Sequence, residues 1–137
     1  MKKLHTKILL IILGCIATVI AGVSIELTVY SQGDNANLVW NVSGMTLSSQ
    51  ERFSIQRKTP QTDYTEIASI TASDNTFSYQ YTDKAAFKTT DVVYTYRIRL
   101  VDVNNPNYVY GTSKETSTYL NISGVKKTWG SIKAMFR

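Results

Sequence analysis

Two residue types that build reactive sites and metal sites are almost missing from this chain. It has one cysteine, Cys15, and one histidine, His5, and both precede residue 24. The rest of the chain therefore has no disulfide and no cysteine-rich metal site. It also cannot assemble a Ser–His or Cys–His nucleophile. These absences argue against an enzyme.

The acidic residues do not support catalysis or metal binding either. The aspartates stand at 34, 63, 74, 83, 91 and 102, without the D-x-D-x-D spacing of a calcium loop. Their scatter among turn-prone segments is typical of solvated loops and not of a pair of glycosidase carboxylates. We predict a non-catalytic chain with no cofactor and no bound metal.

Positive charge is concentrated at the two ends of the chain. The net charge is +5, but seven of the Lys and Arg lie in residues 2–7 and 126–137. The middle holds eight Lys and Arg against all ten Asp and Glu, which leaves it at −2. Because a nucleic-acid surface needs a basic stripe on the folded part, we predict no nucleic-acid partner.

The N-terminal region has the pattern of an export signal. Residues 8–23, ILLIILGCIATVIAGV, form an uncharged apolar run behind Lys2, Lys3 and Lys7, as in a secretory signal or a signal anchor. A straight membrane span needs about 20 residues, so the length favours removal over retention. Cleavage would fall after Ala21 or Ser24. Retention with membrane contact, or lipid attachment at Cys15, are the alternatives, and all three place the rest of the chain outside the cytoplasm.

Apolar and polar side chains alternate over residues 25–122. Period two with β-branched and aromatic residues predicts half-buried strands. About seven short strands, separated by turn-prone clusters such as QGDNAN and NNPN, predict an all-β antiparallel sandwich of two sheets. The alternating apolar positions are Ile25, Leu27, Val29, Leu38, Trp40, Val42, Phe53, Ile55, Phe77, Tyr79, Tyr81, Tyr94, Tyr96, Ile98 and Leu100.

Three stretches resemble a fibronectin type III domain. LVWNVSG at 38–44 is similar to the second strand of that family, where a tryptophan packs between the sheets. FSIQRKTPQTDYTEIASI at 53–70 resembles its third and fourth strands. YTYRIRLVD at 94–102 resembles its sixth strand, so Tyr94 would form the tyrosine corner above Phe87. With the alternation, this predicts a structural core that contains Trp40, Ile55, Phe87, Tyr94, Tyr96 and Ile98.

Two groups of polar-phase residues have simple interpretations. Tyr108 and Tyr110 flank an Asn-rich turn, and we interpret them as strand aromatics in preference to a recognition surface. The arginines Arg57, Arg97 and Arg99 fall on the polar phase of neighbouring strands. We expect them to form solvated ion pairs with partners such as Glu66.

Residues 124–137 form a separate basic tail with a predicted amphipathic helix. Its apolar residues stand at spacings of four, three and four, which places them on one stripe of a helix. Three turns are marginal alone in water, so we expect the stripe to dock. The partner would be its own sandwich, an anionic membrane, a sorting apparatus or another subunit. The docking candidates are Trp129, Ile132, Lys133, Phe136 and Arg137.

The sequence thus predicts a signal peptide or anchor at 1–24, a fibronectin type III-like sandwich at 25–123 and a basic tail at 124–137. The predicted function is that of an exported binding or adhesion module, secreted or at the cell surface, with a protein or a glycan as partner. Its tail would serve in tethering, sorting or assembly. The alternative is a structural subunit that self-assembles into an envelope or filament.

Overall fold

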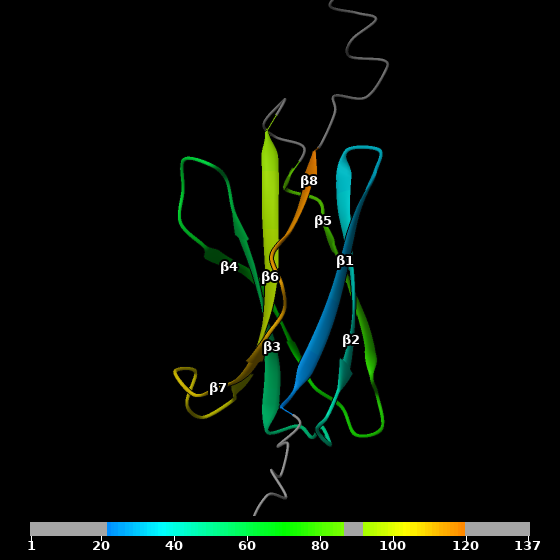
Figure 1. The fold of residues 1–137 in the computed structure, drawn as a ribbon, viewed down its shortest axis with the longest axis vertical. Coiled ribbons are helices and arrows are strands. Elements are labelled where there is room, and N and C mark those ends of the chain that lie inside the picture. Colours follow the sequence, from blue (N-terminus) through cyan, green and yellow to red (C-terminus); the bar gives the residue numbers. More distant parts are fainter. Residues whose placement is uncertain (1–21, 87–91, 120–137) are drawn as a thin grey trace, which may run out of the picture.

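The strands of this chain form two facing sheets, which Figure 1 shows edge-on. The computed structural model describes residues 22–86 and 92–119. The three-stranded sheet has the order β1-β2-β5, and the five-stranded sheet has the order β4-β3-β6-β7, with β8 also paired to β6. The strands are β1 (Ser24–Gln32), β2 (Asn35–Ser43), β3 (Glu51–Lys58), β4 (Thr65–Thr71), β5 (Ser78–Asp83), β6 (Val93–Asp102), β7 (Val109–Thr112) and β8 (Thr116–Tyr119).

All strand pairs are antiparallel. The prediction of an all-β chain with two antiparallel sheets is confirmed. The predicted tail helix, with its docking candidates from Trp129 to Arg137, lies outside the described residues. So does the apolar run up to residue 21, whereas Ser24 already begins β1. No helix long and apolar enough to cross a membrane occurs in the described part of the chain.

The first hairpin has a turn whose residues fix its register. Gln32 pairs with Asn35, so that Gly33 and Asp34 form a two-residue loop. Gly33 has a φ of 60°. A positive φ at the first central residue and not at the second is the requirement of a type II′ turn, which matches the twist of antiparallel strands. This turn sets which side chains of β1 and β2 share a face.

Three aromatic residues from both sheets form the centre of the core. Trp40 of β2 is fully buried, and its ring lies 5.6 Å from Phe53 of β3 and 5.9 Å from Tyr79 of β5. Phe53 and Tyr79 are 4.5 Å apart. The three pairs are edge-on, stacked and tilted, and aromatic pairs add about 0.5–1.5 kcal/mol each beyond the burial of apolar area. The cluster therefore joins the two sheets.

The other predicted core positions fall on the inward phase of the five-stranded sheet. Ile55, Tyr96 and Ile98 are fully buried, and Tyr94 is 4% exposed. Phe87 lies outside the described residues. One aromatic position of the alternation behaves differently: Phe77 precedes β5 and is 52% exposed. Its backbone carbonyl accepts a hydrogen bond from the N–H of Val42, so the backbone of Phe77 pairs with β2 while its side chain stays outside the core.

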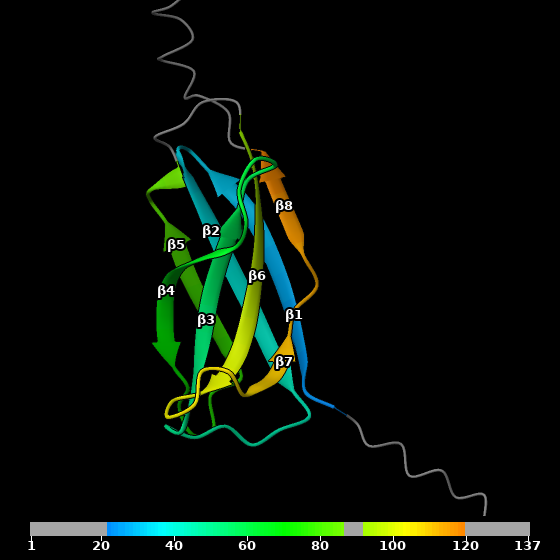
Figure 2. The ribbon, with the colours of Figure 1, turned by 90° about the vertical axis from the view of Figure 1, so that its left-hand side faces the viewer.

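The described chain enters the sandwich at one pole and leaves it at the other. β1 begins at the lower pole of Figure 1, and β8 ends at the upper pole. The connections β2–β3, β4–β5 and β6–β7 lie at the lower pole, and Figure 2 shows the same arrangement from the side. At the lower pole Gly44 has a φ of 84°, and an added Cβ would lie 2.7 Å from the carbonyl oxygen of Gly22. Glycine at position 44 thus allows the entering chain to approach the β2–β3 connection this closely.

Candidate functional site

The outer face of the three-stranded sheet is built almost entirely from neutral polar side chains. Strand alternation directs every second residue of β1, β2 and β5 away from the core. Glu26 is the one charged residue among them. We name this surface the amide–hydroxyl face. Its residues are Glu26, Thr28, Tyr30, Gln32, Asn35, Asn37, Val39, Asn41, Ser78, Gln80 and Thr82.

Hydrogen bonds across all three strands order the polar groups of this face. Asn37 stands opposite Tyr30 of β1 and opposite Thr82 of β5. Its Nδ2 donates to Gln32 Oε1 at 2.6 Å, and its Oδ1 accepts from Thr82 Oγ1 at 2.7 Å. Asn37 is only 9% exposed, so its amide is fixed in place. The row Gln32–Asn37–Thr82 is therefore ordered before any ligand arrives.

A groove of about 440 Å³ lies over this row. Tyr30 is 49% exposed on one side of the groove, and the exposed Gln80 lies on the opposite strand. Val39, half-buried between them, supplies an apolar floor. The Gln80 amide has no hydrogen-bond partner within residues 22–86 and 92–119. An aromatic ring, an apolar floor and an available amide thus surround one shallow space.

The chemistry of this groove suits a neutral ligand that carries many hydroxyl groups. A side-chain amide donates and accepts hydrogen bonds, and so does each hydroxyl of a sugar. The face of an aromatic ring is electronegative and attracts the C–H groups on the apolar side of a sugar ring. With no charged group among the residues that line it, the groove lacks the attraction that an ionic ligand needs.

The outer face of the five-stranded sheet has a different chemistry, because its polar groups bind one another. Arg52 Nη1 lies 3.1 Å from Glu66 Oε1 and 3.0 Å from Ser69 Oγ. Ser54, 3% exposed, donates its hydroxyl to Glu66 Oε2. Glu66, which was expected to pair with Arg57, Arg97 or Arg99, thus pairs with Arg52. We name this surface the cross-linked face.

The network of the cross-linked face continues to Tyr64. Arg97 Nε donates to Gln56 Oε1 at 2.7 Å, and its guanidinium lies 3.9 Å from the Tyr64 ring. Lys58 lies 4.6 Å from the same ring and 3.1 Å from Glu115. Burial and the neighbouring Glu115 carboxylate raise the pKa of Tyr64 to about 12. The Tyr64 hydroxyl and Lys58 in turn lower the pKa of Glu115.

A third polar cluster lies between the sheets, and the sequence pattern did not predict it. Asp83 of β5 is 2% exposed. Its Oδ2 accepts from Arg57 Nη1 at 2.6 Å and from the Tyr96 hydroxyl at 2.9 Å, and its Oδ1 accepts from the N–H of Ala85. The prediction that Arg57 forms a solvated ion pair and that the aspartates are solvated was wrong here. Arg57 and Tyr96 come from the five-stranded sheet, so the cluster bonds the two sheets together.

The pKa values in this buried cluster are set by its geometry. Burial lowers the pKa of Arg57, but the hydrogen bond and charge of Asp83 outweigh this effect and raise it overall. Burial, followed by the charge of Asp83, raises the pKa of Tyr96 well above its ordinary value of 10. Arg57 therefore stays charged and the Tyr96 hydroxyl stays protonated at neutral pH. We infer that the cluster is structural.

The two tyrosines near the Asn-rich turn lie at the lower pole. Tyr108 is 57% exposed and precedes β7, whereas Tyr110 is half-buried within it. Their rings meet edge-on at 4.9 Å, and the Tyr110 hydroxyl donates to Asp102 Oδ2 at 3.2 Å. Tyr110 therefore belongs to the packing of the strand. Tyr108 is left as an exposed ring on a polar turn.

The structure brings together residues that the sequence pattern did not single out, namely Tyr30, Asn37 and Gln80. No group of three or more metal-ligating side chains occurs in the ranges that the structure describes. No protein-family model and no curated protein sequence matches this chain. The resemblance to fibronectin type III domains therefore stays a prediction from the sequence.

Proposed function

We propose that this chain is an exported, non-catalytic binding module that recognises a neutral glycan with its amide–hydroxyl face. One observation carries the proposal: the ordered row Gln32–Asn37–Thr82 lies beside the exposed ring of Tyr30 on an uncharged groove. Polar groups that are fixed before binding lose little conformational freedom when a ligand arrives. The amide–hydroxyl face thus has both parts of a sugar site, hydrogen-bonding groups and a stacking surface.

A fibronectin type III-like architecture is part of the same proposal. Three neighbouring strands pair as β1-β2-β5, and β4-β3-β6-β7 face them. Trp40 lies between the sheets, as the resemblance implies. Tyr94 stands near the start of β6, buried beneath the Arg57 guanidinium at 5.0 Å. In such sandwiches recognition is grafted onto a stable core, and this agrees with a binding surface on one sheet.

Export is proposed from the N-terminal apolar run, and the sandwich favours one of the two cleavage positions. Val23 packs partly buried against the core, and its side chain lies 3.2 Å from the position of an added Cβ on Gly111. Cleavage after Ser24 would remove Val23 and shorten β1, whereas cleavage after Ala21 leaves both intact. We expect the mature chain to begin at Gly22. Intact mass of the exported protein measures this, and a chain that begins at Ile25 contradicts it.

The tail at 124–137 enters the proposal as a tether, a sorting tag or an assembly contact, on sequence grounds alone. A structural subunit would assemble as its concentration rises, and would stop doing so without residues 125–137. Sedimentation velocity of the full chain and of the truncated chain separates the two functions. A monomer that still binds its ligand supports the binding module.

The glycan proposal is tested with short neutral oligosaccharides and isothermal titration calorimetry. Tyr30→Ala removes the stacking surface and Gln80→Ala removes the available amide. We expect Tyr30→Ala to weaken binding about tenfold or more, since exposed aromatic anchors dominate such sites. Because no ion pair forms, affinity should not change with salt. Tyr108→Ala is the matched control, as it removes a similarly exposed ring from the lower pole.

Two outcomes would overturn the assignment. If Tyr108→Ala abolishes binding and Tyr30→Ala does not, the site lies on the β6–β7 turn. If only anionic glycans bind, and added salt weakens their binding, the uncharged groove is not the site.

A further inference from the structure

The edge of the sandwich where β1 meets β7 and β8 is open, because the last strand is split. From the pair Arg99–Thr112 to the pair Tyr96–Thr116, β6 advances three residues and its partner advances four. One extra residue on one strand forms a bulge, which bends that strand away from its sheet. Ser113 anchors the bulge: its N–H donates to the Ile98 carbonyl and its Oγ accepts from the Ile98 N–H, both at 2.9 Å.

The opposite wall of this opening is the outer edge of β1. Within the described ranges, β1 forms a ladder only with β2. The Leu27 carbonyl accepts a hydrogen bond from Thr116 Oγ1 at 3.4 Å, so the backbone of Leu27 faces the opening. In an antiparallel pair alternate residues turn their backbone groups to the same side, so Ile25 also faces it. An unpaired strand edge of this kind is a template for another strand.

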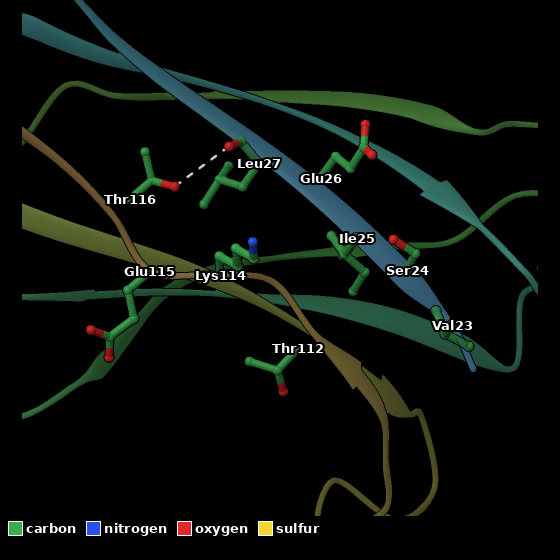
Figure 3. A pocket seen from close by; sticks show the side chains of 9 residues that line it. All are labelled: Val23, Ser24, Ile25, Glu26, Leu27, Thr112, Lys114, Glu115 and Thr116. Carbon is green, nitrogen blue, oxygen red and sulfur yellow. Dashed lines mark hydrogen bonds between the residues drawn. The ribbon is translucent and has the colours of Figure 1, made fainter. Parts of the chain in front are cut away.

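A groove of about 610 Å³ separates the two walls. Figure 3 shows Ile25 and Leu27 directed toward the split strand, and Lys114 directed back toward β1. Glu26 and Glu115 point away from the space between the walls. Glu115 is paired with Lys58 at 3.1 Å, whereas Lys114 has no ion-pair partner within the described residues. Within these ranges, Lys114 is therefore an unpaired cation directed into the groove, although Glu26 and Glu115 also belong to its lining.

We propose that this groove binds the carboxyl-terminal end of an extended peptide, which adds as a strand beside β1. The backbone of the peptide would pair with the outward carbonyl of Ile25 and the outward N–H of Leu27, because the Leu27 carbonyl already accepts the Thr116 hydroxyl. Every second side chain would pack against the apolar floor that these two residues supply. The Thr116–Leu27 hydrogen bond closes the groove at one end. A strand that runs parallel to β1 would thus end beside Lys114, where its terminal carboxylate meets the ammonium group.

The groove and the amide–hydroxyl face use different parts of β1. The glycan proposal depends on the outward side chains of Tyr30 and its neighbours, whereas the peptide proposal depends on the backbone edge. Either proposal can therefore fail without the other.

The probe is the peptide acetyl-TVTVTV with a free carboxyl terminus, added to the full chain labelled with nitrogen-15. We expect the amide signals of Ile25 and Leu27 to shift and their hydrogen exchange to slow, as backbone pairing requires. β4, the edge strand at the far side of the five-stranded sheet, is the internal control. Shifts confined to β4, or none at Ile25 and Leu27 at millimolar peptide, overturn the proposal.

The role of Lys114 is tested with the same peptide carrying a terminal amide. Lys114→Gln should lower the affinity for the free-carboxylate peptide about tenfold and leave the affinity for the amidated peptide unchanged. Lys84→Gln, at another exposed lysine, is the matched control and should change neither affinity. Because Lys114 is exposed, the variant keeps the core intact. An equal loss of affinity for both peptides, or no loss of affinity for either, contradicts a carboxylate beside Lys114.

Discussion

The two outer faces of this sandwich have the same strand geometry and use their polar groups in opposite ways. On the cross-linked face, Arg52, Ser54 and Glu66 bind one another, and Arg97 is held by Gln56 and Tyr64. On the amide–hydroxyl face, one row is ordered and the neighbouring Gln80 amide is left without a partner in the described ranges. A face whose charged groups are already bound in ion pairs, and which has no unpartnered amide beside them, has little to offer a ligand. The difference teaches that a recognition surface is marked by hydrogen-bonding groups that are still available to a ligand, more than by the number of polar side chains.

The difference between the two faces arises from the kinds of side chain that their strands carry. Residues on the five-stranded sheet carry long charged side chains that reach across to neighbouring strands. Those on the three-stranded sheet are mostly uncharged amides and hydroxyls, of which Gln32, Asn37 and Thr82 bond one another. One row is therefore ordered, and the rest of this face is not cross-linked by ion pairs.

The largest expected effect comes from the buried cluster that bonds the two sheets together. Asp83→Ala leaves Arg57 and the Tyr96 hydroxyl without their partner inside the sandwich. Removing one member of a buried ion pair costs about 3–5 kcal/mol, and the partial exposure of Arg57 favours the low end of that range. Urea unfolding measures the loss in the free energy of unfolding. Asp74→Ala, in an exposed turn, is the control and should change stability little. Equal effects would mean that the cluster does not couple the sheets.

A smaller effect should separate the two faces from each other. Glu66→Ala removes the acceptor that binds Arg52 and the buried Ser54 hydroxyl, and should lower the free energy of unfolding by about 1 kcal/mol. Gln80→Ala on the amide–hydroxyl face leaves no partner group unpaired. Its free energy of unfolding should stay within about 0.5 kcal/mol of that of the unaltered chain. Chemical denaturation of both variants tests this contrast. It fails if Gln80→Ala proves the more damaging substitution.

The smallest expected effect is a pH dependence that belongs to the cross-linked face. The pKa of Tyr64 is about 12 in the folded chain, against an ordinary value of 10. Between these values the unfolded chain loses a proton that the folded chain keeps, so stability is full below pH 10 and falls as pH rises toward 12. Tyr64→Phe keeps the ring beneath Arg97 and should flatten part of this fall. Urea midpoints at pH 9 and 11 measure the slope, and an unchanged slope would contradict the assignment. Tyr96 contributes to the same fall.

The alternation of side chains was sufficient to predict the sheets and much of the core. Period two placed Trp40, Ile55 and Ile98 on inward phases, because a half-buried strand needs an apolar residue at every second position. It could not identify Asp83, since a single acid at the end of a strand has the same pattern whether it meets solvent or Arg57. Pairing across the sandwich depends on which strands face each other, and local spacing does not specify that.

The candidate site was harder to predict than the fold. Tyr30, Asn37 and Gln80 lie on three strands, and Gln80 is separated from Asn37 by more than forty residues of chain. The turn QGDN could have supplied the register of β1 against β2, and with it the pairing of Tyr30 and Asn37. The pairing of β5 with β2 depends on the tertiary fold, so local sequence does not predict it. The groove beside Lys114 depends on the extra residue in the last strand, and nothing in the local sequence marks that residue.

The described part of the chain begins and ends at opposite poles, and this has a mechanical consequence. Tension applied along the chain pulls β1 and β8 in opposite directions, parallel to their own axes, so the bonds of each ladder are loaded together in shear. β8 has four residues against β6, whereas β1 has nine against β2. The short strand should rupture first, and the rate of that event would set the lifetime of the module under flow.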